Sequence, residues 1–169
     1  MNFIFEKVDK NNKYILDNVL ELYQHEFNKF YNYYDDLNDE GKYGFILTDK
    51  YITNTNYRAY LIKVNTKIAG FIMINSETKF VRNGIYIAEF FVMPKYRRGY
   101  FSINVMKEIF RQNQGNIEIK VLKNNKKAFK LYSLLINRFV DKVVIHKVQE
   151  EGDEFIYYNF STKDIKTKL

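Results

Sequence analysis

The segment from Glu89 to Phe110 holds the residues whose types and spacing best suit binding chemistry. It reads EFFVMPKYRRGYFSINVMKEIF, so an apolar strand would run into a short basic loop, and the loop would open a helix. The exposed N–H groups at such a helix start, with the positive end of the helix dipole, form an anion site. Lys95, Arg97 and Arg98 add positive charge. The segment therefore predicts a site for a pyrophosphate group, where α/β proteins commonly bind ligands.

Composition excludes several other kinds of site. The chain of 169 residues has no Cys and two His, His25 and His146. Without Cys there is no disulfide, no thiolate metal ligand and no Cys nucleophile. Two histidines do not supply a multi-His metal site, so we expect no bound metal. We expect His25 and His146 to be surface or structural residues.

The elements that precede the segment follow from hydrophobic periodicity. Apolar residues at i, i+3, i+4 and i+7 predict an amphipathic helix from Tyr14 to about Asn28. A polar, tyrosine-rich loop over 31–44 leads into a short helix around 46–52. The runs 57–64 and 67–75 are rich in β-formers and are joined by two residues, which predicts a tight hairpin.

The strand and helix of the segment itself are also predicted from local patterns. Residues 85–93 are apolar except at Glu89, which indicates a strand buried on both faces in the middle of a sheet. Pro94 ends this strand. A helical stripe through Val105 and Ile109 follows, and Gln114-Gly115 stops the helix.

The remaining elements complete a mixed α/β order. A strand over 116–122 precedes a helix capped by Asn124 or Asn125, and two strands follow over 139–148 and 154–160. The order is β-α-(α)-β-β-β-α-β-α-β-β, which implies one mixed sheet with helices on both faces. We expect a single domain over 1–160 and a frayed tail over 161–169.

Charge and hydropathy bound the class of protein. A charged fraction of 28%, a mean hydropathy of −0.43 and no apolar run near ~20 residues exclude a membrane protein. The N-terminal residues carry acids and Asn rather than a signal peptide, so we expect a cytoplasmic protein. Residues 1–80 have a net charge of −1, whereas 81–169 have +8. A polyphosphate ligand, a nucleic acid or solubility could each explain this basic half.

The sequence resembles the GCN5-related N-acetyltransferase (GNAT) superfamily. Its members have a strand ending near V-x-P, a loop Q/R-x-x-G-x-G/A that opens a helix, and a later helix bearing N-x-x-A-x-x-x-Y. That last motif is intact as Asn125, Ala128 and Tyr132. Over its whole length the chain looks like a bacterial subgroup with an undefined acceptor. The resemblance implies a mixed, mostly antiparallel sheet with a splayed central strand pair, and acetyl-CoA-dependent transfer to a primary amine.

The phosphate loop departs from the superfamily pattern. Arg97 occupies the Q/R position, but Tyr100 and Ser102 stand where glycines are expected, and the loop's one glycine is Gly99. Glycine lets the backbone approach a phosphate without a side chain in the way. Under this alignment Tyr100 points outward, and Ser102 either caps the helix or donates its hydroxyl to a phosphate. A one-residue shift would make Gly99 the position of close approach.

The resemblance also implies catalytic roles for two residues. An amine with a pKa of ~10.4 must lose a proton before it attacks a thioester, so a general base is needed. Glu89 suits this role, because desolvation in an apolar strand would raise its pKa. Its alternatives are a carboxylate paired with an Arg or Tyr, or one facing a solvated cleft. Tyr132 is the expected acid for the departing thiolate, and its alternative is a core tyrosine.

The same resemblance implies where acetyl-CoA binds. The pantetheine arm would pair with the end of the central strand, and Asn125 would lie beside it or cap its helix. The diphosphate would bind the basic loop. The residues expected to contact acetyl-CoA are Phe91, Val92, Met93, Arg97, Arg98, Gly99, Tyr100, Phe101, Ser102 and Asn125.

The acceptor is predicted only by class. Acids cluster in the loop 31–44 and in the last hairpin around 150–154, which frame the acceptor site in this superfamily. They favour a cationic small-molecule or peptide amine, with Tyr31, Tyr33 and Tyr34 offering cation–π faces; the alternative is that the acids are solvated loop charges.

Two other readings of the chain stay open. One is a catalytically impaired acyl-CoA-binding or regulatory module. The other, a nucleic-acid surface, is disfavoured, because the basic residues surround a single turn and the acidic loops would repel a duplex. The superfamily also implies a homodimer.

Overall fold

The computed structural model describes residues 2–30, 36–44 and 48–166. The chain divides into two compact units, each described by itself. The first unit comprises Met1–Ile74 and Glu89–Met93, and the second comprises Asn75–Ala88 and Pro94–Leu169. The expectation of a single domain over 1–160 stays a prediction.

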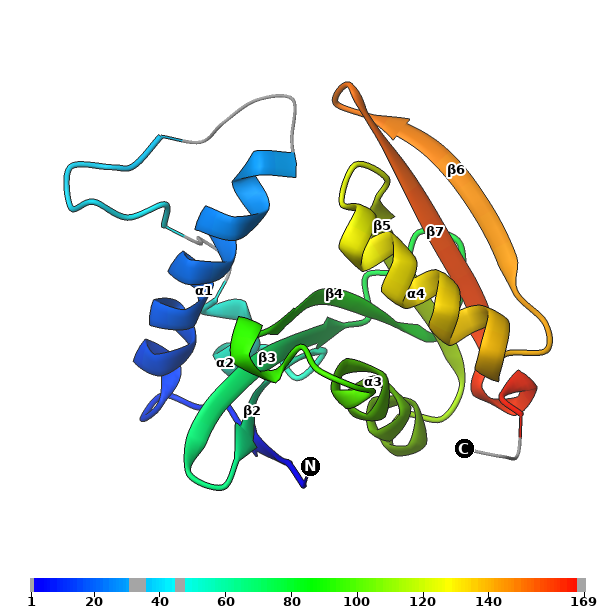
Figure 1. The fold of residues 1–169 in the computed structure, drawn as a ribbon, viewed down its shortest axis with the longest axis horizontal. Helices are drawn as coiled ribbons and strands as arrows, with labels where there is room; N and C mark the ends of the chain where they lie inside the picture. Colours follow the sequence, from blue (N-terminus) through cyan, green and yellow to red (C-terminus); the bar gives the residue numbers. More distant parts are fainter. Residues whose placement is uncertain (1, 31–35, 45–47, 167–169) are drawn as a thin grey trace. The chain divides into compact units, whose positions relative to one another are not determined.

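The described residues form a mixed α/β fold (Figure 1). In chain order the elements are β1 (Ile4–Lys7), α1 (Lys13–Phe27), α2 (Lys50–Thr53), β2 (Tyr57–Val64), β3 (Lys67–Asn75), β4 (Gly84–Val92), α3 (Phe101–Gln112), β5 (Asn116–Leu122), α4 (Lys126–Phe139), β6 (Val144–Glu150) and β7 (Asp153–Ser161), with short 3-10 helices at Asn28–Phe30, Pro94–Tyr96 and Thr162–Asp164. The strands join in the order β1-β2-β3-β4-β5-β7-β6. Strands β1 and β2, β5 and β7, and β6 and β7 pair antiparallel, whereas β4 and β5 pair parallel. The predicted mixed, mostly antiparallel sheet is therefore confirmed.

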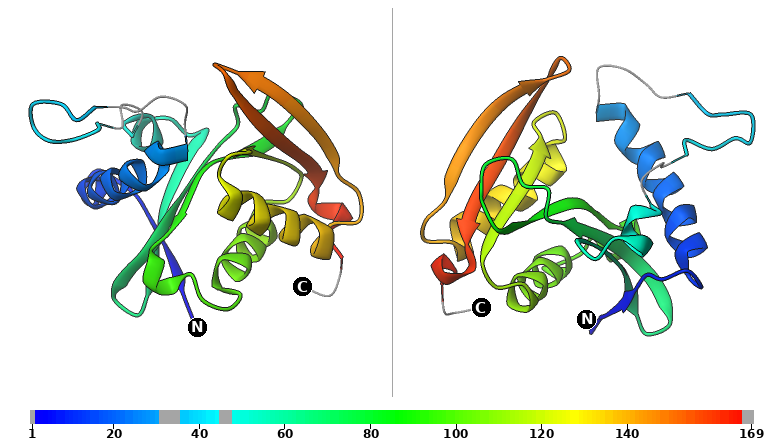
Figure 2. Two further views of the ribbon diagram at one scale, coloured as in Figure 1. Left: turned by 45° about the horizontal axis from the view of Figure 1, so that its top comes forward. Right: turned by 180° about the vertical axis from the view of Figure 1, so that it is seen from behind.

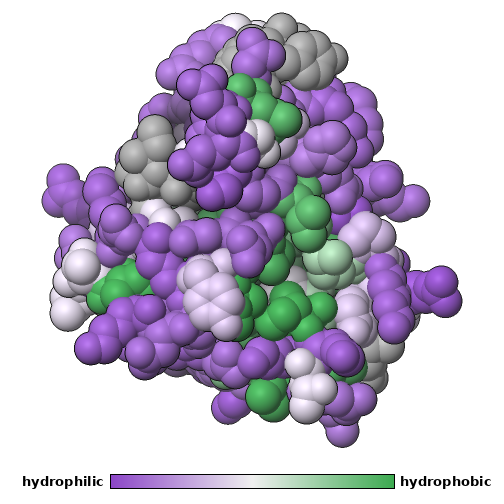
Figure 3. Space-filling model, turned by 90° about the vertical axis from the view of Figure 1, so that its left-hand side faces the viewer, coloured by the Kyte–Doolittle hydropathy of each residue, from purple (hydrophilic) through white to green (hydrophobic). Residues whose placement is uncertain are grey.

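The first unit buries one face of α1 as the periodicity predicts. The buried residues of this helix are Leu16, Val19, Leu20 and Tyr23. The hairpin of β2 and β3 turns at the predicted two residues, and Asn65 takes a left-handed φ of 55° there. The face that Figure 3 shows is mainly hydrophilic, with apolar residues in small groups.

The second unit packs α3 and α4 with the strands β5, β7 and β6. Figure 2 shows α3 beside α4 in both of its views, and the two helices are in contact. Helix α3 buries the predicted stripe, and Phe110 packs edge-to-face on Phe160 with ring centroids 5.2 Å apart. No helix in the described parts of the chain is both long and apolar enough to cross a membrane.

Two predicted segments differ from the structure. The strand predicted over 139–148 begins only at Val144, so its first residues were wrongly assigned. Phe139 instead ends α4, because it continues at i+3 the apolar stripe that includes Ile136. The short helix expected around 46–52 is Lys50–Thr53, and residues 45–47 lie outside the described part.

The tail expected to fray is structured up to Lys166. Ser161 belongs to β7, and Thr162, which is buried, donates its N–H to the Gly115 carbonyl at 2.8 Å. The Thr162 hydroxyl also accepts the Gly115 N–H at 2.9 Å. Ile165 forms a bridge with Val140. These contacts hold the tail because its backbone groups find partners in the fold.

Candidate active site

Glu89 lies on β4, within the part of this strand that belongs to the first unit. The hydroxyl of Tyr23, from α1, donates a hydrogen bond to Oε2 of Glu89. Glu89 is half-buried, and Tyr23 is 8% exposed. The burial on both faces that the apolar run predicted for this strand is therefore only partial: Ile87, Phe91 and Val92 are its buried residues. The pairing with a tyrosine is one of the alternatives that the sequence left open for Glu89.

Aromatic rings surround Tyr23. Its ring stacks on Phe27 at 5.1 Å between centroids and 26° between planes. Phe71 and Phe91 meet it edge-on at 5.6 and 5.7 Å. Sequence reasoning missed Tyr23 as a site residue, because a tyrosine on the buried stripe of an amphipathic helix looks like any core aromatic. The fold alone brings it to Glu89.

The end of β4 packs closely against β3. The Met93 N–H donates to the Ala69 carbonyl at 2.7 Å. A Cβ added at Gly70 would lie 2.0 Å from the Phe91 carbonyl oxygen, so only glycine fits at this approach of two backbones. The parallel ladder of β4 and β5 runs from Gly84 to Ile87, and β4 continues past it among the described residues. The expected splaying of the two strands stays a prediction.

The basic loop that follows β4 opens directly into α3. Arg97 and Arg98 are exposed, and Gly99 takes a φ of +59° with no described atom within 4 Å of an added Cβ. Gly99 is thus required for a left-handed backbone, not for close packing. Tyr100 is the N-cap of α3 and makes no side-chain capping hydrogen bond. Ser102 is the second residue of this helix, so the expectation that it caps the helix is wrong.

The side chain of Tyr100 is directed away from the core, as the alignment required. It is 56% exposed, and its hydroxyl accepts a hydrogen bond from Nη1 of Arg138 at 3.3 Å. The Arg138 guanidinium carbon lies 5.4 Å from the centre of the tyrosine ring. The neighbouring Phe101 is buried and packs against Tyr96 at 5.9 Å. Only the backbone of Phe101 is therefore suited to ligand contact.

Helix α4 carries the other two expected site residues. Asn125 caps this helix: its Oδ1 accepts the Ala128 N–H at 3.1 Å. The capping role that the sequence favoured for Asn125 is confirmed, and any contact with acetyl-CoA stays a prediction. Tyr132 is 7% exposed and shares the buried face of α4 with Leu135 and Ile136.

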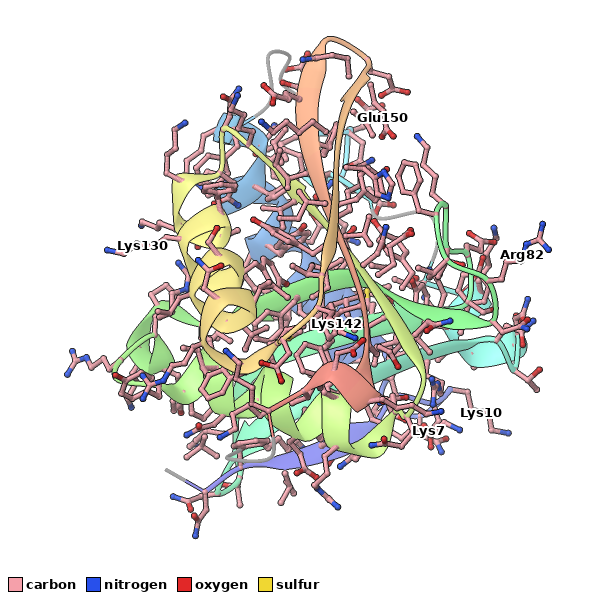
Figure 4. The ribbon with its side chains drawn as sticks, turned by 90° about the vertical axis from the view of Figure 1, so that its right-hand side faces the viewer. Lys7, Lys10, Arg82, Lys130, Lys142 and Glu150 are labelled. Atoms are coloured by element: carbon pink, nitrogen blue, oxygen red, sulfur yellow. The ribbon has the colours of Figure 1, made fainter. Side chains whose placement is uncertain are left out.

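Two acids of the last hairpin, Glu150 and Glu154, are paired with lysines. Oε1 of Glu150 lies 2.6 Å from Lys79 Nζ, and its Oε2 lies 2.5 Å from Lys120 Nζ. Glu154 pairs with Lys123 at 2.5 Å. These internal pairs weaken the hairpin as an attractor for a cationic acceptor, because the lysines neutralise its charge. Figure 4 shows Glu150 near the tip of the hairpin.

The other acidic segment is described in part. Asp36 and Asp39 are exposed, and Glu40 pairs with Lys42 at 3.0 Å. Tyr31, Tyr33, Tyr34 and Asp35, which were expected to contact the acceptor, lie outside the described residues.

Both histidines have structural partners. Nδ1 of His25 lies 3.3 Å from the Tyr43 hydroxyl, and the His146 ring stacks on Phe80 at 3.9 Å. Among the described residues, no three His, Asp or Glu side chains gather as a metal site would require.

The basic loop suits the diphosphate of acetyl-CoA on the features of this chain. The start of α3 has no side-chain cap, Gly99 leaves open space, and Arg97 and Arg98 are exposed beside it. Uncapped helix N–H groups and guanidinium groups are the donors that phosphate oxygens accept from. The residues present therefore fit this ligand.

Comparisons with known proteins agree with this assignment. The sequence model of the acetyltransferase (GNAT) family matches residues 16–135. No curated relative matches the sequence. An acetyltransferase from Thermus thermophilus superimposes with a TM-score of 0.68 at 10% identity, covering 95% of this chain and 97% of that one.

Two further solved structures have the same fold. A spermidine N-acetyltransferase from Vibrio cholerae, solved with CoA and spermine, has a TM-score of 0.64 at 11% identity and covers 96% of each chain. The protein smu.2055 from Streptococcus mutans UA159 has a TM-score of 0.63 at 16% identity, covering 96% of this chain and 99% of that one. The family match over most of the sequence, together with the shared fold, shows that the chain belongs to the acetyltransferase (GNAT) family and is an N-acetyltransferase that uses acetyl-CoA.

Proposed function

We propose that this enzyme transfers the acetyl group directly to a primary amine, with Glu89 as the general base. The observation that carries the proposal is the Glu89 carboxylate, half-buried on β4 and hydrogen-bonded by Tyr23. An alkylamine has a pKa of ~10.4 and needs such a base at neutral pH. Direct attack is favoured over a thioester intermediate on the enzyme, because the chain has no Cys.

Other residues of the chain would bind acetyl-CoA, which supplies the acetyl thioester. Arg97, Arg98 and the backbone N–H groups at the start of α3 hold the diphosphate, since all of these are donors. The backbone of Phe91–Met93 pairs with the amides of the pantetheine arm. The Tyr132 hydroxyl carries the proton that the leaving sulfur takes up.

The acceptor we propose is a cationic amine, either a small molecule or a peptide. Exposed Asp36 and Asp39 in the loop after α1 support this class, because exposed carboxylates attract cations over about a Debye length of ~10 Å. The Vibrio cholerae spermidine N-acetyltransferase, a structural neighbour solved in complex with CoA and spermine, supports this class. The paired acids of the hairpin do not contribute to the proposal.

The acceptor class is tested by an assay of CoA thiol release with cationic, neutral and anionic primary amines at low and high salt. We expect cationic amines to react fastest, and high salt to reduce their advantage because it screens the exposed acids. Equal rates for the three classes at both salt concentrations would refute a cationic acceptor.

The base is tested separately with Glu89→Gln, which keeps the shape of the side chain and removes its basicity. We expect kcat at pH 7 to fall by about 10²–10⁴-fold, the usual contribution of a general base, with the KM for acetyl-CoA unchanged. Tyr132→Phe should lower kcat without changing either KM. Full activity of E89Q would show that another group takes the proton.

A further inference from the structure

We infer that Tyr23 is a positioning residue, which holds the Glu89 carboxylate in the orientation needed for proton abstraction. The inference rests on the proposed role of Glu89 as the base. It assigns to α1 a part in catalysis beyond shaping the core.

The Tyr23 ring is fixed by packing on three sides. Phe27 stacks on it from the same helix, Phe71 meets it from β3 and Phe91 from β4. Phe71 and Phe91 also contact each other, with centroids 5.9 Å apart. Aromatic pairs of this kind stabilise the packing beyond the area they bury. This packing fixes the direction of the phenol, whose hydroxyl donates to Oε2 of Glu89.

A fixed donor of this kind restrains the carboxylate. The terminal torsion of a glutamate side chain is broad and roughly two-fold, so a carboxylate without a fixed donor samples many orientations. A hydrogen bond from a hydroxyl to a carboxylate is among the stronger kinds in proteins. General-base catalysis depends on hydrogen-bond geometry at the reacting proton, and a misplacement of 1 Å can cost about 10²-fold in rate.

Helix α1 also anchors the loop that follows it. Two residues before Tyr23, the Glu21 carboxylate accepts the N–H groups of Tyr43 and Gly44 at 2.7 and 3.1 Å. The loop over 36–44, which carries the exposed acids Asp36 and Asp39, and the orientation of Glu89 are thus both fixed to one helix of the first unit. The positions of Glu89 and of this loop relative to each other therefore depend on α1.

The test is a double-mutant cycle of Tyr23→Phe and Glu89→Gln, with Tyr57→Phe as the matched control. Y23F removes the hydroxyl and keeps the aromatic packing, whereas Tyr57 is a buried tyrosine of the same unit that packs edge-to-face on Tyr51 at 5.0 Å. We expect Y23F to lower kcat by about 10–100-fold with the KM for acetyl-CoA unchanged, and Y57F to keep wild-type kcat. In the E89Q background, Y23F should cause no further loss, because there is no base left to orient.

Each other outcome overturns a separate statement. Y23F could lower kcat by the same factor in the wild-type and E89Q backgrounds, or leave kcat at the level of Y57F. Either result would show that Tyr23 does not act through Glu89, and would leave the role of Glu89 as the base untouched. If E89Q keeps full activity, the proposed base is wrong. Should Y23F fail to fold, Glu89→Asp breaks the pair from the other side, since it keeps a carboxylate but shortens its reach; an unchanged kcat in E89D would overturn the inference.

Discussion

At the scale of single residues, Glu150 shows how local partners set a charge. Burial opposes its ionisation, but hydrogen bonds from Lys120, Lys79 and Tyr157 outweigh that effect and lower its pKa to about 2. Burial, and then the bond to Glu150, raise the pKa of the Tyr157 phenol, so the phenol stays a neutral donor. The Tyr157 hydroxyl lies 2.8 Å from Oε1 of Glu150. This network joins β5, β6, β7 and the segment that precedes β4.

We expect Glu150→Gln to destabilise the protein near pH 7 and to have little effect at very low pH. The folded pKa is lower than the ordinary value of 4.5, so the stabilisation is present above pH 4.5 and is lost as the pH falls through about 2. Because the carboxylate is partly exposed, solvent screening limits the effect to about 1 kcal/mol.

Urea unfolding of wild-type and E150Q protein at pH 7 and pH 3 measures this difference, which should be smaller at pH 3 because that pH lies within the window over which the stabilisation is lost. Glu151→Gln, at an exposed position of the same turn, is the matched control and should change stability little at either pH. An equal loss for E150Q at both pH values would mean that shape, not charge, matters at position 150.

At the scale of elements, the contact of β3 with the end of β4 depends on Gly70. We expect Gly70→Ala to lower the free energy of unfolding by about 1–3 kcal/mol or more, because its Cβ would lie 2.0 Å from the Phe91 carbonyl oxygen and the backbone must move. Gly99→Ala is the comparison, since it strains a left-handed residue without a clash and should cost only about 1–2 kcal/mol. Thermal unfolding of the two variants checks this order; a G70A protein as stable as the wild type would contradict it.

The anchor between α1 and the loop over 36–44 leads to a prediction about substrate binding. We expect Glu21→Ala to raise the KM for the amine by about 10-fold and to leave the KM for acetyl-CoA unchanged, because losing hydrogen bonds to a charged group, worth ~1.5–3 kcal/mol each, releases this loop. Asn18→Ala, at an exposed position of the same helix, is the control. Steady-state kinetics with each substrate varied in turn measures both KM values. An unchanged KM for the amine in E21A would show that this loop plays no part in acceptor binding.

At the scale of the whole molecule, the positive charge lies mainly in residues 81–169, whose net charge is +8. Arg97 and Arg98 are part of this excess, and so are Lys130 and Lys142, which lie elsewhere on the second unit (Figure 4). A general field would make all of these residues equivalent for binding a polyanion, whereas a defined diphosphate site would depend on the two arginines.

We expect acetyl-CoA at 100 times its dissociation constant to stabilise the wild-type protein by about 2.7 kcal/mol, and Arg97→Ala/Arg98→Ala to reduce the thermal shift at the same ligand concentration. Lys142→Ala, in the segment between α4 and β6, is the control and should keep the wild-type shift. A wild-type shift in the double variant would place the diphosphate elsewhere. The absence of any shift in the wild-type protein would count against the basic loop as a site for acetyl-CoA.

The predictions from sequence succeeded where a structure depends on near neighbours. The two-residue turn between β2 and β3, the buried stripe of α1 and the cap of α4 by Asn125 are all local, and each was predicted. Local patterns were misleading where two of them overlap. The predicted strand started at Phe139, but the helical stripe of α4 extends to Phe139, so the strand begins later, at Val144.

The sequence by itself determined the family, the order of elements and the presence of an acid on the central strand, because motifs and periodicity are properties of short stretches of chain. Only the tertiary structure decided that Tyr23 bonds Glu89, that Gly70 admits the Phe91 backbone and that Glu21 holds the loop at Tyr43. These partners are far apart in the chain, and which of many aromatic, glycine and acidic residues meet depends on how helices and strands pack. Packing is set by all the contacts of the core together, so no single stretch of sequence contains it.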